Sequence, residues 1–242
     1  MVTAIAHRGL SAQYPENTLL AFREAIAVGA DAIEFDVHQT LDGELVVMHD
    51  GDVSRTTNGT GFIKDLTFAE LRELDAGQSE LIPTLREVLE LGRGKVHFQL
   101  EVKVAKIEEA ILGCIDEVGV FDDIYFSSFG HTIMKVVKEL QPEAKVATLE
   151  TERPMGTPAQ EQHMIKAFIK NAQKVGAIAI HPSLDNVSAR LVEEAHAAGL
   201  RVNVWTVDSE MLVEELVAMG VDGIFSNRVD MLIEVLHNLQ GS

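Results

Sequence analysis

One pattern recurs along this chain: an amphipathic helical segment ends at a glycine, and a β-branched strand begins within a few residues. It occurs in Ala25–Gly29 before Ala32–Phe35, and again at Gly176, Gly199 and Gly220. A glycine suits the end of a helix because the residue after the last turn often needs a positive φ. Strands that alternate with helices form βαβ units, so the repeat predicts an α/β fold built on a parallel sheet.

We expect eight principal strands, each a short apolar run. Their centres lie near Ile5, Phe35, Phe98, Phe126, Val146, Ala179, Val204 and Ile224. Eight βα units in 242 residues fit a closed (β/α)8 TIM barrel. A doubly wound open sheet is the alternative, but no Gly-x-Gly-x-x-Gly motif follows the first strand. Thr67 with Glu70, and Thr84 with Glu87, fit the capping box, so a helix is expected to begin after each threonine.

One segment, at about residues 40–84, interrupts the repeat after the second strand. It contains a hairpin turn at Asp42-Gly43 and a short strand at Leu45–Met48. A two-residue turn joins antiparallel strands, so this strand is expected to lie outside the parallel barrel. Because no linker is evident, we expect residues 1–242 to form a single barrel domain, with the insertion contributing to its active site.

The charge balance excludes several classes of partner. The chain has 20 Lys and Arg residues against 38 Asp and Glu residues, a formal net charge of −18. Such a chain repels nucleic-acid backbones and anionic membrane surfaces, so binding to either is not expected. No stretch approaches the ~18 apolar residues that a membrane span needs. Cys114 is the one cysteine, which excludes a disulfide framework, and the first residues lack a secretion signal, so a cytoplasmic location is expected.

Polar side chains concentrate at the carboxyl ends of the expected strands, where barrel enzymes hold their active sites. They are His7 and Arg8 after the first strand, Glu34 and Asp36 on the second, His49 after the inserted strand, and Glu101 and Lys103 at the third. Taken alone, a carboxylate here could form a structural ion pair, such as Glu101 with Lys103 or Glu34 with Arg8. Their convergence on one rim favours a functional site, because burying so many charges requires compensating charge.

The residue types predict a chemistry. Three carboxylates without cysteine are typical of a hard-cation site for Mg²⁺, Ca²⁺ or Mn²⁺. Arg8 and Lys103 supply fixed positive charge that suits phosphate. His7 and His49 reach the rim from different segments, and two imidazoles can act as base and acid near neutral pH. Together these groups indicate metal-assisted cleavage of a phosphodiester.

A series of motifs, in this order and over most of the chain, resembles the glycerophosphodiester phosphodiesterase family. Between Ala6 and Asp230 they are His7-Arg8-Gly9, Pro15-Glu16-Asn17-Thr18, Glu34-Phe35-Asp36-Val37, His49-Asp50, Arg55-Thr56-Thr57, Ile82-Pro83-Thr84-Leu85, Glu101-Val102-Lys103, Trp205-Thr206-Val207 and Asp222-Gly223-Ile224. Two small departures exist. Val102 stands where isoleucine is commoner, and Asp208 stands where asparagine is common, which adds charge near the mouth of the site.

The resemblance implies a (β/α)8 barrel with a small insertion after strand two. It also implies hydrolysis of glycerophosphodiesters, such as glycerophosphocholine or glycerophosphoethanolamine, to sn-glycerol 3-phosphate and an alcohol. The implied roles are Glu34, Asp36 and Glu101 as ligands of one divalent cation, Mg²⁺ or Ca²⁺, His7 and His49 as the general acid/base pair, Arg8 and Lys103 as phosphate contacts, and Trp205 as a lining residue of the substrate pocket. Which histidine is the acid stays open. Glu16 is expected to support the charge network, and Asn17 to cap the following helix.

Two other functions are compatible with the same rim. A phospholipase C-like enzyme would end at a cyclic phosphate, but the chain shows no basic amphipathic helix for docking on a membrane. A non-catalytic phosphate-binding barrel would not need both histidines and all three carboxylates. For the assembly, apolar residues in Val213–Met219 allow a homodimer interface, although a core-facing stripe explains them equally well.

Overall fold

A computed structural model of the chain describes residues 1–151 and 156–240. Over these residues, eight parallel strands form the barrel: β1 (Thr3–His7), β2 (Ala32–Gln39), β4 (His97–Val102), β5 (Ile124–Ser128), β6 (Lys145–Glu150), β7 (Ala179–Pro182), β8 (Arg201–Val204) and β9 (Gly223–Ser226). β1 pairs with both β2 and β9, which closes the sheet on itself. The eight expected strands and the (β/α)8 barrel are confirmed, and the open-sheet alternative is wrong.

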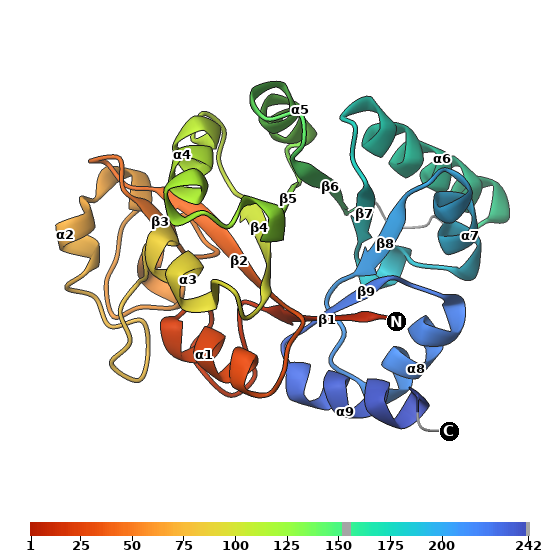
Figure 1. Ribbon diagram of the computed structural model, residues 1–242, viewed down its shortest axis with the longest axis horizontal. Helices are drawn as coiled ribbons and strands as arrows, with labels where there is room; N and C mark the ends of the chain where they lie inside the picture. Colours follow the sequence, from red (N-terminus) through yellow and green to blue (C-terminus); the bar gives the residue numbers. More distant parts are fainter. Residues whose placement is uncertain (152–155, 241–242) are drawn as a thin grey trace.

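Helices surround the barrel (Figure 1). They are α1 (Leu19–Ala27), α3 (Leu85–Gly92), α4 (Glu108–Val118), α5 (His131–Leu140), α6 (Pro158–Lys174), α7 (Ala189–Ala197), α8 (Glu210–Met219) and α9 (Val229–Gln240). The main core lies between these helices and the outward faces of the strands. Within it, the ring of Phe35 meets Phe22 at 6.0 Å and Phe98 at 6.2 Å, both edge to face.

The helix ends follow the expected glycine chemistry. Gly220 closes α8 with a φ of 85°, a left-handed conformation that a Cβ atom would strain. In α8 itself, Val213 and Leu216 are buried. Core packing therefore accounts for these two apolar residues, whereas Met211 at the start of the same helix is 63% exposed.

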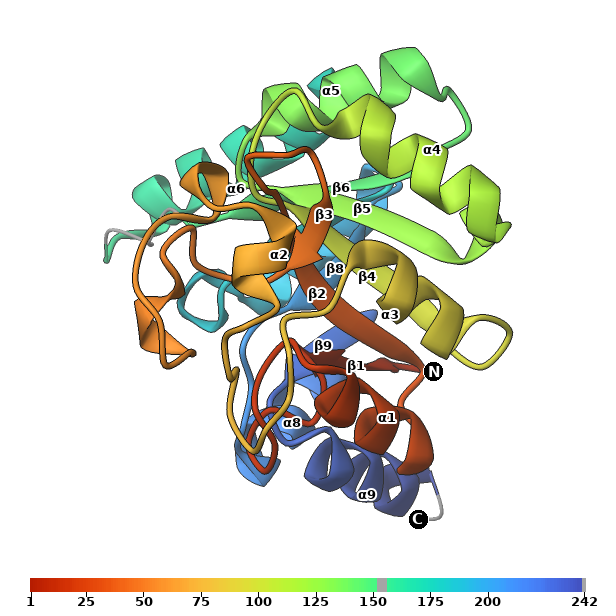
Figure 2. The same cartoon turned by 90° about the vertical axis from the view of Figure 1, so that its left-hand side faces the viewer.

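The insertion after β2 has its own small core. It contains β3 (Leu45–Val47), which is antiparallel to β2, the short 3-10 helices η1 (Val53–Arg55) and η2 (Ile63–Asp65), and α2 (Phe68–Leu71). Both expected capping boxes are present, one at the start of α2 and one at the start of α3. Figure 2 shows the insertion at the end of the barrel away from the N terminus, over the carboxyl ends of the strands.

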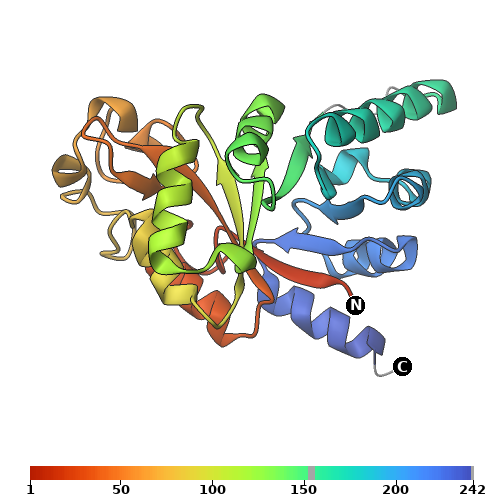
Figure 3. The same cartoon turned by 45° about the horizontal axis from the view of Figure 1, so that its top comes forward.

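The closing seam joins the two ends of the chain. Figure 3 shows β1 beside β9, and in their register Ala6 lies opposite Ser226. The seam therefore places the residues that follow β9 next to those that follow β1. Among the described residues, no helix combines the length and apolar character required to cross a bilayer.

Candidate active site

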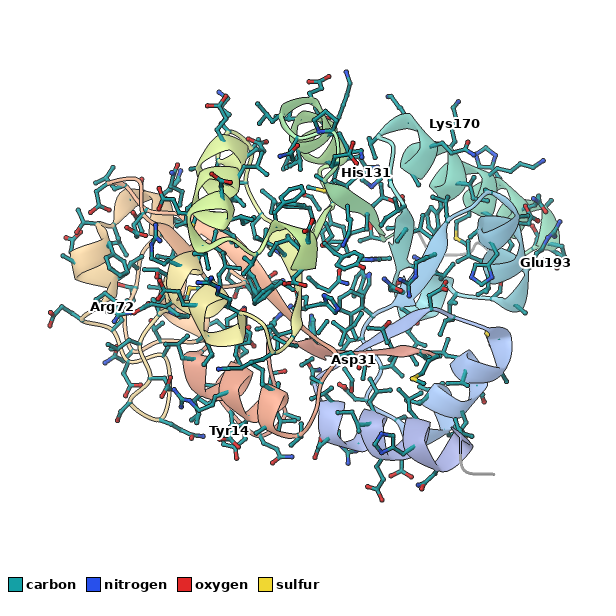
Figure 4. The ribbon with its side chains drawn as sticks, in the orientation of Figure 1. Tyr14, Asp31, Arg72, His131, Lys170 and Glu193 are labelled. Carbon is teal, nitrogen blue, oxygen red and sulfur yellow. The ribbon has the colours of Figure 1, made fainter. Side chains whose placement is uncertain are left out.

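A pocket opens at the carboxyl ends of the barrel strands. It is lined by His7, Arg8, Glu34, His49, Glu101, Ser127, Phe129, Leu149, Trp205 and Phe225. Side chains fill the barrel centre beneath it (Figure 4). Six of the eight predicted site residues line this pocket. The other two, Asp36 and Lys103, lie next to Glu101.

Three carboxylates form a buried cluster. One oxygen from each of Glu34, Asp36 and Glu101 lies within 4.8 Å of the others, and their exposed fractions are 5%, 0% and 8%. The cluster arises because Asp36 of β2 lies opposite Glu101 of β4 in the parallel register. Burial and the charge of Asp36 raise the pKa of Glu101 to about 7, and the same two causes raise the pKa of Glu34 well above its usual value. The set could hold a metal ion, which would relieve this repulsion.

Two cations accompany the carboxylates. Lys103 Nζ lies 2.8 Å from Glu101 Oε1 and 3.4 Å from Asp36 Oδ1, and Arg8 Nε lies 3.5 Å from Asp36 Oδ2. Burial opposes the charged form of Asp36, but Lys103 and Arg8 outweigh it and hold the pKa of Asp36 below its usual value. The ion pair of Glu101 with Lys103 is therefore present, and it is part of the cluster.

The two ring nitrogens of His7 face different neighbours. Its Nδ1 lies 2.7 Å from Asn227 Oδ1, and its Nε2 lies 4.0 Å from Glu34 Oε2 in the pocket. Burial, followed by the charge of Arg8, lowers the pKa of His7 to about 4. In this environment the imidazole is neutral at pH 7.

His49 reaches the pocket from the insertion. Its Nδ1 lies 2.6 Å from Asp50 Oδ1, and Asp50 also accepts a hydrogen bond from Arg55 Nε. The Arg55 hydrogen bond lowers the pKa of Asp50 to about 2, so Asp50 stays ionised. The backbone of His49 is fixed as well, because His38 Nε2 lies 3.1 Å from its carbonyl oxygen.

A salt-bridge network links the insertion to the barrel. Arg55 donates to both oxygens of Glu16, at 2.7 and 3.0 Å, and Arg8 Nη1 donates to Glu16 Oε1 at 3.0 Å. The expected support from Glu16 is thus confirmed. A continuous path of charged contacts therefore runs from Asp50, beside His49, through Arg55 and Glu16 to Arg8.

The prediction that Asn17 caps the following helix is wrong. Thr18 is the N-cap of α1, in extended geometry, and its side chain accepts from the Ala21 amide. Asn17 has a φ of 58°, which differs from the extended backbone of an N-cap residue. Its side-chain amide instead donates to Asp36 Oδ2 at 2.9 Å, so Asn17 orients a carboxylate of the cluster.

Part of the pocket lining is apolar. Trp205 is fixed by a 2.8 Å hydrogen bond from its Nε1 to the His181 carbonyl, and the ring of Phe129 meets it edge to face at 5.7 Å. Trp205 was implied by the family resemblance, whereas Phe129, Leu149 and Phe225 were not predicted. A signal existed, because Leu149 and Phe225 each stand one position before a polar residue, Glu150 or Ser226, at the end of a barrel strand.

Comparisons with known proteins agree on one family. The family model described as "Glycerophosphoryl diester phosphodiesterase family" matches residues 7–231. The chain is 38% identical to a glycerophosphodiester phosphodiesterase of Caldanaerobacter subterraneus subsp. tengcongensis, over 96% of each chain. It is 32% identical to one of Bacillus altitudinis, over 99% of this chain and 100% of that one. Among solved structures, a phosphodiesterase of Oleispira antarctica in complex with the product sn-glycerol-3-phosphate matches with a TM-score of 0.84 and 30% identity, over 96% of each chain.

Proposed function

The chain belongs to the glycerophosphoryl diester phosphodiesterase family, and on that premise we propose how its side chains hydrolyse glycerophosphodiesters to sn-glycerol 3-phosphate and an alcohol. The observation that carries the assignment of roles is a single pocket lined by two carboxylates, one cation and two imidazoles, with Asp36 and Lys103 next to Glu101. No one of these groups specifies the reaction. Together they supply a cation site, a phosphate site and proton transfer.

Glu34, Asp36 and Glu101 would hold one divalent cation, Mg²⁺ or Ca²⁺. The donor set fits, because both ions prefer carboxylate oxygens and all three ligand atoms lie within 4.8 Å of one another. When bound, the cation would supply positive charge that stabilises the negative charge developing on the phosphoryl oxygens. Asn17 keeps Asp36 in place through its 2.9 Å hydrogen bond.

Arg8 and Lys103 bind the phosphate group. Burial opposes the charge on both side chains, but the surrounding carboxylates outweigh it and raise both pKa values. Both side chains therefore stay charged throughout the working pH range. A guanidinium and an ammonium beside the cluster can contact two oxygens of one phosphodiester.

His7 and His49 act as the acid/base pair. Each ring has its Nδ1 beside a fixed oxygen, of Asn227 and of Asp50 respectively. This leaves Nε2 of each ring for proton transfer in the pocket that both residues line. One ring takes the proton of the attacking nucleophile and the other gives a proton to the leaving alkoxide.

Trp205 forms the substrate wall with Phe129 and Phe225. A pocket lined by both apolar and charged side chains suits a diester whose carbon skeleton is small and whose phosphate carries the charge. We propose a cytoplasmic location, which suits a chain whose one cysteine, Cys114, has no second cysteine with which to form a disulfide.

The test is an assay of the purified protein with glycerophosphocholine, measuring released sn-glycerol 3-phosphate with and without EDTA. We expect EDTA to abolish release and added Mg²⁺ or Ca²⁺ to restore it. Activity that survives complete metal removal would contradict the cation site. If metal-supplemented protein releases no sn-glycerol 3-phosphate, the hydrolytic function is wrong, and a cyclic phosphate in the phosphorus NMR spectrum would identify the phospholipase C-like reaction instead.

A further inference from the structure

His7 ends a chain of hydrogen bonds that begins at Asp208. Asp208 Oδ2 accepts from Asn227 Nδ2 at 2.7 Å, and Asn227 Oδ1 lies 2.7 Å from His7 Nδ1. Two further donors hold the other oxygen of Asp208: the Asn227 backbone amide at 2.8 Å and the Ser226 hydroxyl at 3.0 Å. Asp208 and Asn227 thus face each other across the loops that follow β8 and β9, behind the pocket.

The chemistry of Asp208 decides which way the Asn227 amide points. An ionised carboxylate has no proton to donate, so it selects the NH₂ group of Asn227 and leaves Oδ1 to face His7. No other neighbour makes this choice as firmly. The Ser11 hydroxyl lies 3.0 Å from Asn227 Oδ1 and 2.7 Å from the His7 carbonyl oxygen. While it donates to that carbonyl, it could accept from an inverted Asn227.

An oxygen facing Nδ1 in turn decides the tautomer of His7. The amide oxygen only accepts, so Nδ1 must carry the proton, and the lone pair of the neutral ring then lies on Nε2. Nε2 is the nitrogen that faces the pocket, 4.0 Å from Glu34 Oε2. We propose that Asp208 and Asn227 are positioning residues that hold His7 in the Nδ1–H tautomer with Nε2 aimed at the substrate. The proposal rests on the function proposed above, in which His7 transfers a proton.

The geometry allows the aspartate and the asparagine to exchange positions without loss of a hydrogen bond. With asparagine at 208, its oxygen can accept from Ser226 and from the backbone amide of residue 227, and its NH₂ group can donate to residue 227. With aspartate at 227, one oxygen can accept that NH₂ group and the other can accept from His7 Nδ1. The double variant D208N/N227D thus keeps every hydrogen bond, whereas each single variant loses or weakens one.

Four forms of the full-length protein test the proposal: wild type, D208N, N227D and D208N/N227D. In D208N, Asn227 is free to invert its amide. In N227D, two carboxylates face each other where a 2.7 Å hydrogen bond stood. We expect each single variant to lower kcat by roughly tenfold to a hundredfold with KM changed by less than about threefold, because substrate contacts are untouched. The double variant should recover most of the lost kcat. Asp122→Asn removes an exposed carboxylate before β5 and serves as the matched control with wild-type kcat.

Nitrogen-15 NMR of the His7 ring supplies a readout that does not depend on turnover. We expect the Nδ1–H tautomer in the wild type and in D208N/N227D, and a mixture of tautomers in D208N. Wild-type kcat in both single variants, a double variant as impaired as its parents combined, or an Nε2–H ring in the wild type would each overturn the proposal. If the wild-type protein hydrolyses no glycerophosphodiester, the function fails, while the NMR comparison still decides the tautomer.

Discussion

At the scale of single residues, Glu34 and Asp36 stand two positions apart on one strand, yet their surroundings shift the pKa values of their carboxyl groups in opposite directions. Burial and the neighbouring charge of Asp36 raise the pKa of Glu34, whereas Lys103 and Arg8 outweigh burial at Asp36 and lower its pKa. Glu34 therefore has the greater need of an added positive charge. A divalent cation in the cluster would stabilise the ionised form of Glu34 more than that of Asp36.

We expect Glu34→Gln to weaken cation binding, because it keeps the shape of the side chain and removes its charge. The cation concentration that gives half-maximal activity should rise by at least about tenfold. Calorimetric titration of the protein with Mg²⁺ and Ca²⁺ measures the same change without substrate. Glu44→Gln, exposed in the hairpin turn, is the matched control. An unchanged titration curve in Glu34→Gln would remove this residue from the ligand set.

The two histidines make a second prediction at this scale. We expect His7→Ala and His49→Ala each to lower kcat by roughly 10²–10⁴-fold, the usual contribution of a general acid or base. Steady-state assays with saturating cation measure the loss, and the exposed His163→Ala on α6 controls for the removal of an imidazole. Near-normal turnover in either variant would exclude that histidine from proton transfer.

At the scale of elements, the insertion carries one residue of the proposed acid/base pair while the barrel carries the other. His49 follows β3, and its ring is oriented by Asp50, which Arg55 of η1 holds. Arg55 also binds both oxygens of Glu16 in the loop after β1. The guanidinium of Arg55 therefore links the residue that orients the His49 ring to the loop after β1, in addition to the contact of His38 with the His49 backbone.

We expect Arg55→Met to lower kcat by roughly tenfold to a hundredfold, since small displacements of a catalytic group are costly. Arg72→Met is the matched control: it removes a 3.0 Å ion pair between Arg72, which Figure 4 labels, and Glu87. That variant should change the free energy of unfolding by about 1 kcal/mol or less and leave kcat within about twofold of wild type. Equal kcat values in the two arginine variants would show that Arg55 has no special role.

Sequence periodicity carries most of the information about elements. Strands and capping boxes depend on neighbouring residues, so all eight barrel strands and both boxes could be predicted. The antiparallel β3 could be predicted as well, from the turn residues Asp42 and Gly43, although the connection is longer than the expected two-residue turn, because Gln39 lies opposite Leu45. Individual hydrogen bonds between residues of distant segments could not be predicted from the sequence. Asn17 resembles a helix cap locally, and only the closed fold brings Asp36 within its reach. The partner of His7 lies 220 residues away, so no local pattern identifies Asn227.

At the scale of the whole molecule, the closed barrel buries an imidazole away from the proposed chemistry. His181 on β7 is 1% exposed, accepts a 3.0 Å hydrogen bond at Nε2 from Asn203, and lies against the ring of Phe225. Burial, followed by the charge of Arg201, lowers its pKa from 6.5 to about 3. A neutral histidine in the interior links the stability of the fold to pH.

Below pH 6.5 the unfolded chain gains a proton at His181 that the folded chain does not bind until about pH 3. Stability therefore falls as the pH is lowered through this window, by up to about 1.4 kcal/mol per pH unit from this group. The slope of stability against pH is measured from urea unfolding midpoints between pH 7 and pH 4. We expect His181→Gln to show a shallower slope than the wild type, and the exposed His163→Gln to keep the wild-type slope. Parallel curves for all three proteins would contradict this prediction.

The seam between β1 and β9 also sets an order in time. His7 and its hydrogen-bond partner Asn227 lie 220 residues apart, so translation produces Asn227, which follows the last barrel strand, long after His7. A nascent chain therefore carries the proposed acid/base residue His7 long before Asn227 can contact it. Closure of the barrel by β9 is therefore required before Asn227 can orient the ring of His7.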